Sequence, residues 1–166
     1  ETLGVLSELR TNALESIDWV QIAFPEFNIQ DCRTKEAEKF VKAVPDDLKS
    51  FFLAAVENHQ ITRLAIEEFK KQSPDLKILG KLMTQHHNIL RDKLGVTVPK
   101  IDRMIEAVLK AGAFGAKIVG SGGGGCIVTL CPKERKEAVM EALKNVEAKA
   151  YKVSVDEGAR VIRNED

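Results

Sequence analysis

A run of six residues at positions 120–125, Gly-Ser-Gly-Gly-Gly-Gly, constrains the fold of this chain more than any other feature of its sequence. Glycine costs about 0.5–1 kcal/mol relative to alanine inside a helix or strand, so this run belongs to a loop. Short β-type apolar segments, 116–119 and 126–131, stand on either side of it. The pattern predicts a strand, a glycine loop and a second strand. Because a plain hairpin turn needs only one or two glycines, the run indicates a further purpose.

Two purposes fit such a loop, and the residues alone leave both open. Its backbone amides can gather in one concavity and hold a phosphate, or its bare backbone can pack against a neighbouring domain. Two familiar phosphate-binding loops are excluded. The loop of P-loop NTPases ends in Gly-Lys followed by Ser or Thr, whereas Cys126 and Ile127 follow Gly125 here. A dinucleotide-binding loop opens a helix, whereas this loop opens a strand-like segment.

Helical periodicity dominates the rest of the chain, with apolar side chains at steps of three and four. The expected helices cover 1–24 (one or two helices), 34–44, 46–72, 74–94, 99–112 and 132–145. Thr34 is expected to cap the second of these segments through its hydroxyl. Residues 148–155 alternate in polarity and predict a last strand. The expected fold class is α+β, a helical layer packed on a small antiparallel sheet, with residues 1–166 as a single domain.

Composition narrows the class of protein. Lysine plus arginine and aspartate plus glutamate both number 25, and this zero net charge argues against a general nucleic-acid-binding protein. Three cysteines, a low and odd number, are typical of a reduced cytoplasmic protein. Two of them, Cys126 and Cys131, flank a predicted strand and are expected as small core residues. No apolar run reaches the roughly 18 residues of a membrane span, so we expect no membrane partner.

The remaining reactive side chains are weaker candidates for a site. His86 and His87 are neighbours on a predicted helix and have no metal-ligating residue at the required spacing, so we expect no metal site. One ring should face the edge of the core and the other water. Asp31 would raise the pKa of the adjacent Cys32 thiol, which argues against a reactive thiolate. No serine, histidine and aspartate set suggests a nucleophilic triad.

Residues 94–130 combine, in this order, a helix that begins at Pro99, a Gly115-Ala116-Lys117 segment, the glycine run and an apolar strand. This order and spacing resemble the third sequence signature of the GHMP kinase superfamily. Its members include galactokinases, homoserine kinases, mevalonate kinases and phosphomevalonate kinases.

Upstream segments extend the resemblance toward galactokinases. Residues 57–65 (ENHQITRLA) and 79–94 (LGKLMTQHHNILRDKL) resemble two galactokinase segments, and residues 28–41 add a weaker likeness. The resemblance therefore covers roughly residues 28–160. Galactokinases usually carry a phenylalanine within the loop, where Gly124 stands here, and the all-glycine form is more similar to mevalonate kinases.

The resemblance implies the C-terminal half of an ATP-dependent kinase that phosphorylates a small-molecule hydroxyl, galactokinase-like or, alternatively, mevalonate-type. A non-catalytic small-molecule-binding or regulatory domain is a third alternative. The implied fold is that of the GHMP kinase C-terminal domain, which is ferredoxin-like. The implied partner is an N-terminal half that would hold most of the ATP and Mg²⁺ contacts and the catalytic residues. The residues implied for the phosphate region are Gly120, Ser121, Gly122, Gly123, Gly124 and Gly125.

Overall fold

The computed structural model describes residues 2–120, 125–155 and 158. Its helices are α1 (Thr2–Ala23), α2 (Thr34–Phe40), α3 (Lys49–Phe69), α4 (Leu76–Asp92), α5 (Pro99–Lys110) and α6 (Lys136–Asn145). Short 3₁₀ helices cover Val41–Ala43 and Lys133–Arg135, and the strands are β1 (Gly115–Val119) and β2 (Cys126–Leu130). All the predicted helical segments are present, and the first of them is a single helix.

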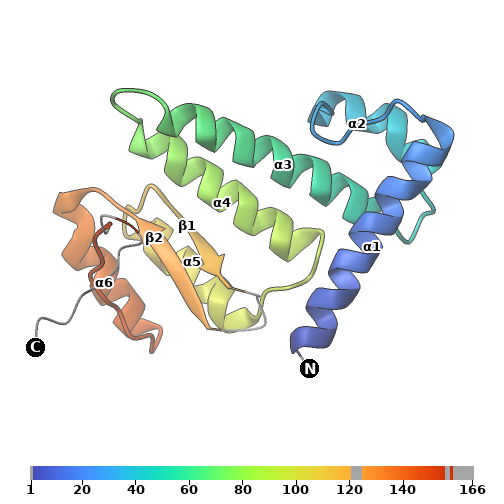
Figure 1. The fold of residues 1–166 in the computed structure, drawn as a ribbon. Helices are drawn as coiled ribbons and strands as arrows, with labels where there is room; N and C mark the ends of the chain where they lie inside the picture. Colours follow the sequence, from blue (N-terminus) through green and yellow to red (C-terminus); the bar gives the residue numbers. More distant parts are fainter. Residues whose placement is uncertain (1, 121–124, 156–157, 159–166) are drawn as a thin grey trace, which may run out of the picture.

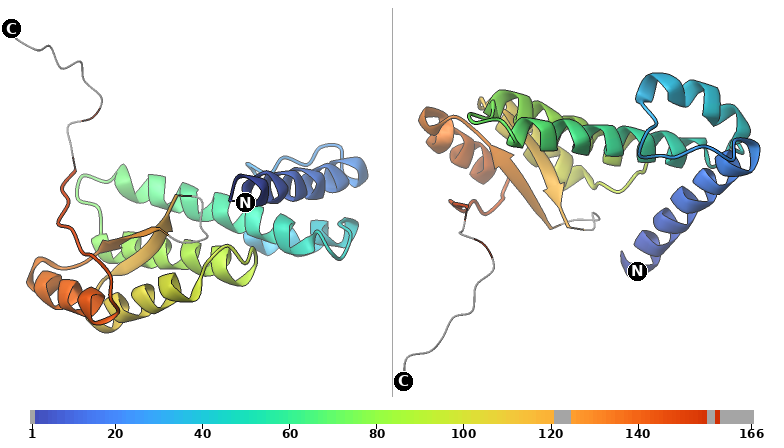
Figure 2. Two further views of the ribbon diagram at one scale, coloured as in Figure 1. Left: turned by 90° about the horizontal axis from the view of Figure 1, so that it is seen from below. Right: turned by 45° about the horizontal axis from the view of Figure 1, so that its top comes forward.

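The long helices α3 and α4 lie side by side and form the centre of the molecule (Figure 1). α1 and α2 pack against α3, while α4 packs against β1. Figure 2 shows that α1 and α2 lie at the end of the molecule remote from α6. The α3–α4 pair thus connects two parts of the structure, and each part has its own core.

The first core is built from one face of α1, from α2 and from the first half of α3. Its members are Val20, Phe27, Cys32, Ala37, Val44, Leu48, Phe52 and Val56. Phenylalanine rings fill its centre: the Phe27 and Phe40 ring centroids are 4.8 Å apart, and Phe24 meets Phe40 edge-on at 5.1 Å. Such tilted and edge-on contacts suit the ring quadrupoles. This core joins α1, α2 and α3.

The second core lies between α5, α6 and one face of the sheet. The α5 residues Ile101, Met104, Ile105 and Val108 follow the i, i+3, i+4, i+7 pattern that places side chains on one helix face. They meet side chains of the sheet and of α6, which are Ala116, Ile118, Val139 and Leu143. The hairpin is therefore supported from one side by two helices.

β1 and β2 pair in antiparallel register from Gly115 opposite Leu130 to Val119 opposite Cys126. The order α5–β1–β2–α6 matches the central part of the β-α-β-β-α-β order of ferredoxin-like folds. The predicted α+β class, with a helical layer on a small antiparallel sheet, is confirmed.

The predicted third strand over 148–155 is wrong, because none of these residues pairs with β1 or β2. Ala148 and Ala150 rest against the second core, whereas Val153 and Val155 are 82% and 100% exposed. Alternating polarity makes a strand only where a neighbouring edge supplies backbone partners. Among the described residues the sheet therefore has two strands.

Two local predictions also need correction. Arg33, and not Thr34, is the N-cap of α2, because the Thr34 amide and hydroxyl both donate to Oε1 of Gln60 on α3, at 2.8 and 2.6 Å. A tertiary partner has displaced the expected local cap. Cys126 is exposed and Cys131 half-buried, so the expectation of two core cysteines is wrong for Cys126 and only partly met for Cys131. Strand alternation places Cys126 on the face of the sheet that points away from α5.

Candidate functional site

The glycine loop leaves β1 at Gly120 and enters β2 at Gly125. Both glycines have positive φ, +88° and +93°, the left-handed region in which other residues are strained. The loop ends therefore need glycine for their backbone conformation. Residues 121–124, which include Ser121 and the predicted phosphate-binding Gly122, Gly123 and Gly124, lie outside the described residues.

A close contact between two glycines sets the position of the hairpin against α4. A Cβ added to Gly115 on β1 would lie 1.7 Å from the carbonyl oxygen of Gly80 on α4. A Cβ added to Gly80 would lie 2.4 Å from the carbonyl carbon of Phe114. The backbones of helix and strand touch here, which no residue with a side chain would allow.

Thr84, one turn beyond Gly80, fixes the same contact by hydrogen bonds. Its hydroxyl donates to the Gly80 carbonyl and accepts the Ala116 amide of β1, both at 3.2 Å. α4 thus satisfies a backbone donor on the edge of β1 that β2 does not reach. The start of the glycine loop is consequently held by a helix as well as by its partner strand.

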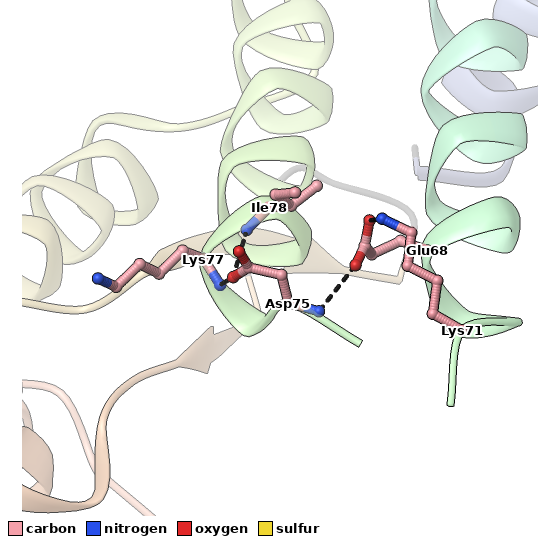
Figure 3. Close-up of polar contacts among 5 residues, drawn as sticks. All are labelled: Glu68, Lys71, Asp75, Lys77 and Ile78. Atoms are coloured by element: carbon pink, nitrogen blue, oxygen red, sulfur yellow. Dashed lines mark hydrogen bonds and ion pairs between the residues drawn. The ribbon is translucent and has the colours of Figure 1, made fainter. Parts of the chain in front are cut away.

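The N-terminus of α4 is anchored in turn by α3 (Figure 3). Asp75 caps α4 by accepting the amides of Lys77, at 2.8 Å, and Ile78, at 3.4 Å. The buried carboxylate of Glu68 accepts the Asp75 amide at 2.7 Å and pairs with Lys71 at 2.6 Å. The Lys71 ammonium holds the pKa of Glu68 below its usual range. This network ties the end of α3 to the beginning of α4.

His87 lies on the core side of α4 and is fully buried. Its Nε2 is 3.4 Å from Oδ1 of Asp102 on α5, in a geometry that does not make a hydrogen bond, so neither ring nitrogen has a partner among the described residues. The other oxygen of Asp102 accepts the Thr97 hydroxyl at 3.2 Å. Burial lowers the pKa of His87 although Asp102 acts in the opposite sense, and the ring is therefore neutral near pH 7.

His86 lies on α4 and Lys117 on β1, and no sequence pattern links the two. Both are half-buried. Burial and the neighbouring Lys117 ammonium lower the pKa of His86, and burial lowers the pKa of Lys117. The prediction for the two histidines holds for His87, which faces the core, while His86 is only partly open to water. Within residues 2–120, 125–155 and 158, no group of three His, Cys, Asp or Glu side chains is placed to hold a metal ion.

One cavity in the described part of the chain adjoins the loop. It has a volume of about 130 Å³ and is lined by Leu6, Leu9, Leu90, Leu94, Val96, Ile118 and Gly120. A larger one of about 370 Å³ lies between α2, α3 and α4 and shares no residue with the first. The lining of the smaller cavity is apolar, so it suits an apolar group and not a phosphate.

The pKa of the buried Cys32 thiol is raised, as the sequence predicts, but Asp31 is not the cause. Burial and the Glu36 carboxylate raise its pKa, so it is no thiolate at neutral pH. Asp31, the expected neighbour, is instead held by the side-chain amide of Asn28 at 3.0 Å. No described helix combines the length and the apolar character that a membrane crossing requires.

Comparison with known proteins places this geometry in a family. The family model described as GHMP kinases C terminal matches residues 65–149, just over half of the chain. The galactokinase of Haemophilus influenzae (strain PittGG) is 33% identical over 153 residues, which is 82% of this chain. This chain belongs to the GHMP kinase family. The match of this GHMP kinase chain covers 39% of the Haemophilus protein, so it spans well under half of that relative.

Other relatives agree with this membership. The mevalonate kinase of Methanocaldococcus jannaschii is 38% identical over 72 residues, 43% of this chain and 22% of that protein. The crystal structure of Lactococcus lactis galactokinase complexed with galactose has a TM-score of 0.76 at 24% identity, over 86% of this chain and 37% of that one. The structure of L. major mevalonate kinase in complex with R-mevalonate has a TM-score of 0.53 at 24% identity, over 69% and 35%. The resemblance read from the sequence is thus confirmed.

Proposed function

We propose that this chain is the C-terminal half of an ATP-dependent kinase that phosphorylates a hydroxyl of a sugar, as a galactokinase does. One observation carries the choice of a sugar. The likeness to galactokinase extends over 82% of the chain, whereas the likeness to the Methanocaldococcus mevalonate kinase covers 43%. The likeness to galactokinase therefore takes in much more of the chain than the likeness to that mevalonate kinase.

The glycine loop is the part of this half assigned to the phosphate region. Phosphoryl transfer depends on holding the reactants in position and on neutralising phosphate charge. In this proposal the amides of residues 122–125 bind the phosphate of the transferred group, and Ser121 serves the turn. The left-handed backbone of Gly120 and Gly125 supports this role, because it lets the loop reverse without a Cβ at either end.

ATP, as the second substrate, supplies the phosphoryl group. The described residues offer no cluster of three metal-ligating side chains, so in this proposal Mg²⁺ and most of the ATP lie on the partner half. That half is the N-terminal, ATP-binding part of the same kinase. A cytoplasmic location is proposed on the three cysteines, all of which are free in the structure.

A mevalonate-type kinase is the second candidate. The all-glycine sequence of residues 122–125 favours it, and so does the fold likeness to the L. major enzyme. The two candidates share the loop and the reaction type and differ in the acceptor. They are therefore distinguished by substrate and not by the presence of kinase activity.

The test is release of ADP from ATP by the product of the complete reading frame, with the 166-residue chain assayed beside it. The acceptors are galactose, other sugars and mevalonate. We expect turnover of galactose by the former and none by the latter. Turnover of mevalonate alone would move the assignment to the second candidate, and no turnover of any acceptor by the complete product would contradict the kinase proposal.

A further inference from the structure

The larger cavity, between α2, α3 and α4, is formed by one face of each of the two long helices. α3 contributes Glu57, Gln60 and Ile61 to its lining. α4 contributes Gln85, Asn88 and Ile89, which repeat the same i, i+3, i+4 spacing. The two faces meet because α3 and α4 lie side by side (Figure 1). The volume of about 370 Å³ falls within the range of about 300–1,000 Å³ that is typical of small-ligand sites.

The side-chain amide of Gln60 is held in one orientation by α2. Its Oε1 accepts the Thr34 amide at 2.8 Å and the Thr34 hydroxyl at 2.6 Å, so both lone pairs of that oxygen are used. The Nε2 of the same amide carries two N–H donors and makes no hydrogen bond within residues 2–120, 125–155 and 158. A positioned pair of donors is therefore left for a ligand.

α4 adds two more amide side chains to the cavity. Gln85 is exposed and Asn88 is half-buried, and in the described part of the chain neither side chain has a hydrogen-bond partner. Each of these amides offers two donors and an acceptor oxygen. Such a set suits a molecule whose groups both donate and accept hydrogen bonds, as hydroxyl groups do.

The charge of the cavity lining is balanced. The only ionisable side chain among the described residues that line it is Glu57, whose Oε1 is 3.0 Å from the Lys93 ammonium. A phosphate would find no unpaired cation here, and a cationic ligand would have to compete with Lys93. The cavity therefore favours a neutral ligand, while the apolar side chains of Ile61 and Ile89 suit its C–H surface.

We propose that this cavity binds a small, neutral, polyhydroxylated molecule, a monosaccharide or a cyclic polyol. Its hydroxyl groups accept from Nε2 of Gln60, exchange hydrogen bonds with the amides of Gln85 and Asn88, and donate to the unpaired Oε2 of Glu57. The cavity shares no residue with the one beside the glycine loop. The site is therefore separate from the region assigned to phosphoryl transfer, and the inference does not depend on the proposed kinase function.

The experiment is a methyl NMR titration of the product of the complete reading frame, labelled with ¹³C at the δ1 methyl groups of isoleucine. The probes are myo-inositol and D-glucose at increasing concentration. Valine substitutions at Ile61, Ile89 and Ile101 assign the three signals that matter. Ile61 and Ile89 should shift together and saturably, whereas Ile101, which is 1% exposed in the second core, should not move.

Variants separate the site from a general effect of the probe on the surface. Gln85→Met and Asn88→Leu remove an amide and keep the approximate size of the side chain. Each should raise the Kd of the probe by about threefold to tenfold, because neutral hydrogen bonds are lost. Gln72→Met removes an exposed amide outside the cavity and should bind as the unsubstituted protein does. Matching methyl spectra without probe verify that the variants are folded.

Each outcome decides the proposal. The absence of a saturable shift of Ile61 and Ile89 with both probes would overturn it, and so would an equal effect of Gln85→Met and Gln72→Met. A response to N-methylacetamide but to neither polyol would also overturn it, because the cavity would then suit a peptide segment of a partner protein. These measurements involve no turnover, so a failure here is distinct from a failure of the ADP-release assay.

Discussion

At the scale of single residues, the most demanding position in this fold is the contact between Gly80 and Gly115. It brings two backbones together where neither can carry a side chain, and it sets the direction in which β1 leads to the glycine loop. Gly80 does not stand out in the sequence, and Gly115 appears there only as part of a longer signature, because the need for both glycines arises only when helix and strand meet. The glycines that end the loop, Gly120 and Gly125, could be recognised because they belong to a run.

Gly115→Ala tests this contact. The added methyl group would overlap the Gly80 carbonyl, so the free energy of unfolding should fall by about 3 kcal/mol or more. Urea denaturation followed by circular dichroism measures the change. Gly4→Ala is the matched control: no atom lies within 4 Å of its added Cβ, and in helix α1 it should stabilise the chain by about 0.5–1 kcal/mol. A Gly115→Ala variant as stable as the unsubstituted chain would contradict the described packing.

The buried ring of His87 predicts how stability depends on pH. Its pKa in the folded chain is lowered, chiefly by burial, so below about pH 6.5 the unfolded chain binds the proton more readily than the folded one. The contribution of this ring to the free energy of unfolding is fully present above that pH and declines as the pH falls. His87→Gln should flatten this decline between about pH 7.5 and 5.5, with His86 contributing a remainder of the same sign. Denaturation curves at the two pH values give the change in the free energy of unfolding. A change in His87→Gln as large as in the unsubstituted chain would show that the ring is not buried as described.

The contact between α4 and β1 shows where residue-level reading of the sequence stops. Thr84 and Ala116 are far apart along the chain and meet because α4 lies along β1. A pattern of residue types could not indicate that meeting, since it depends on which helix lies at the edge of the strand.

At the scale of elements, α4 determines the arrangement of the site. It is capped by Asp75, held to α3 through Glu68, and bonded to β1 through Thr84. Periodicity predicted α4 almost to its ends, as it did α5, because apolar residues recur on one face and Pro74, Gly95 or Gly112 interrupt the pattern. Periodicity failed for residues 148–155, where alternation had no strand edge to pair with.

Asp75→Ala tests the cap of α4. The loss of the carboxylate that accepts two first-turn amides should lower the free energy of unfolding by about 1 kcal/mol. Asp46→Ala is the control before α3: the carboxylate there is exposed and pairs with Lys49, so its removal should matter less. Thermal unfolding of the two variants in parallel compares them. Equal losses, or a larger loss for Asp46→Ala, would contradict the role of the cap.

At the scale of the whole molecule, two cores are joined by the α3–α4 pair, and only one of them is adjacent to the glycine loop. The family match begins inside α3 and covers α4, the hairpin, α5 and α6. The core of α1 and α2 lies outside that match.

The central claim is that the glycine loop serves phosphoryl transfer. The most direct test is the rate of ADP release with galactose by the product of the complete reading frame, unsubstituted and as Gly123→Val, with Gly4→Ala as the control. We predict turnover by the unsubstituted protein and by Gly4→Ala, and loss of turnover in Gly123→Val at an unchanged unfolding midpoint, because a branched side chain would block the approach of the phosphate. Full activity in Gly123→Val would contradict the claim.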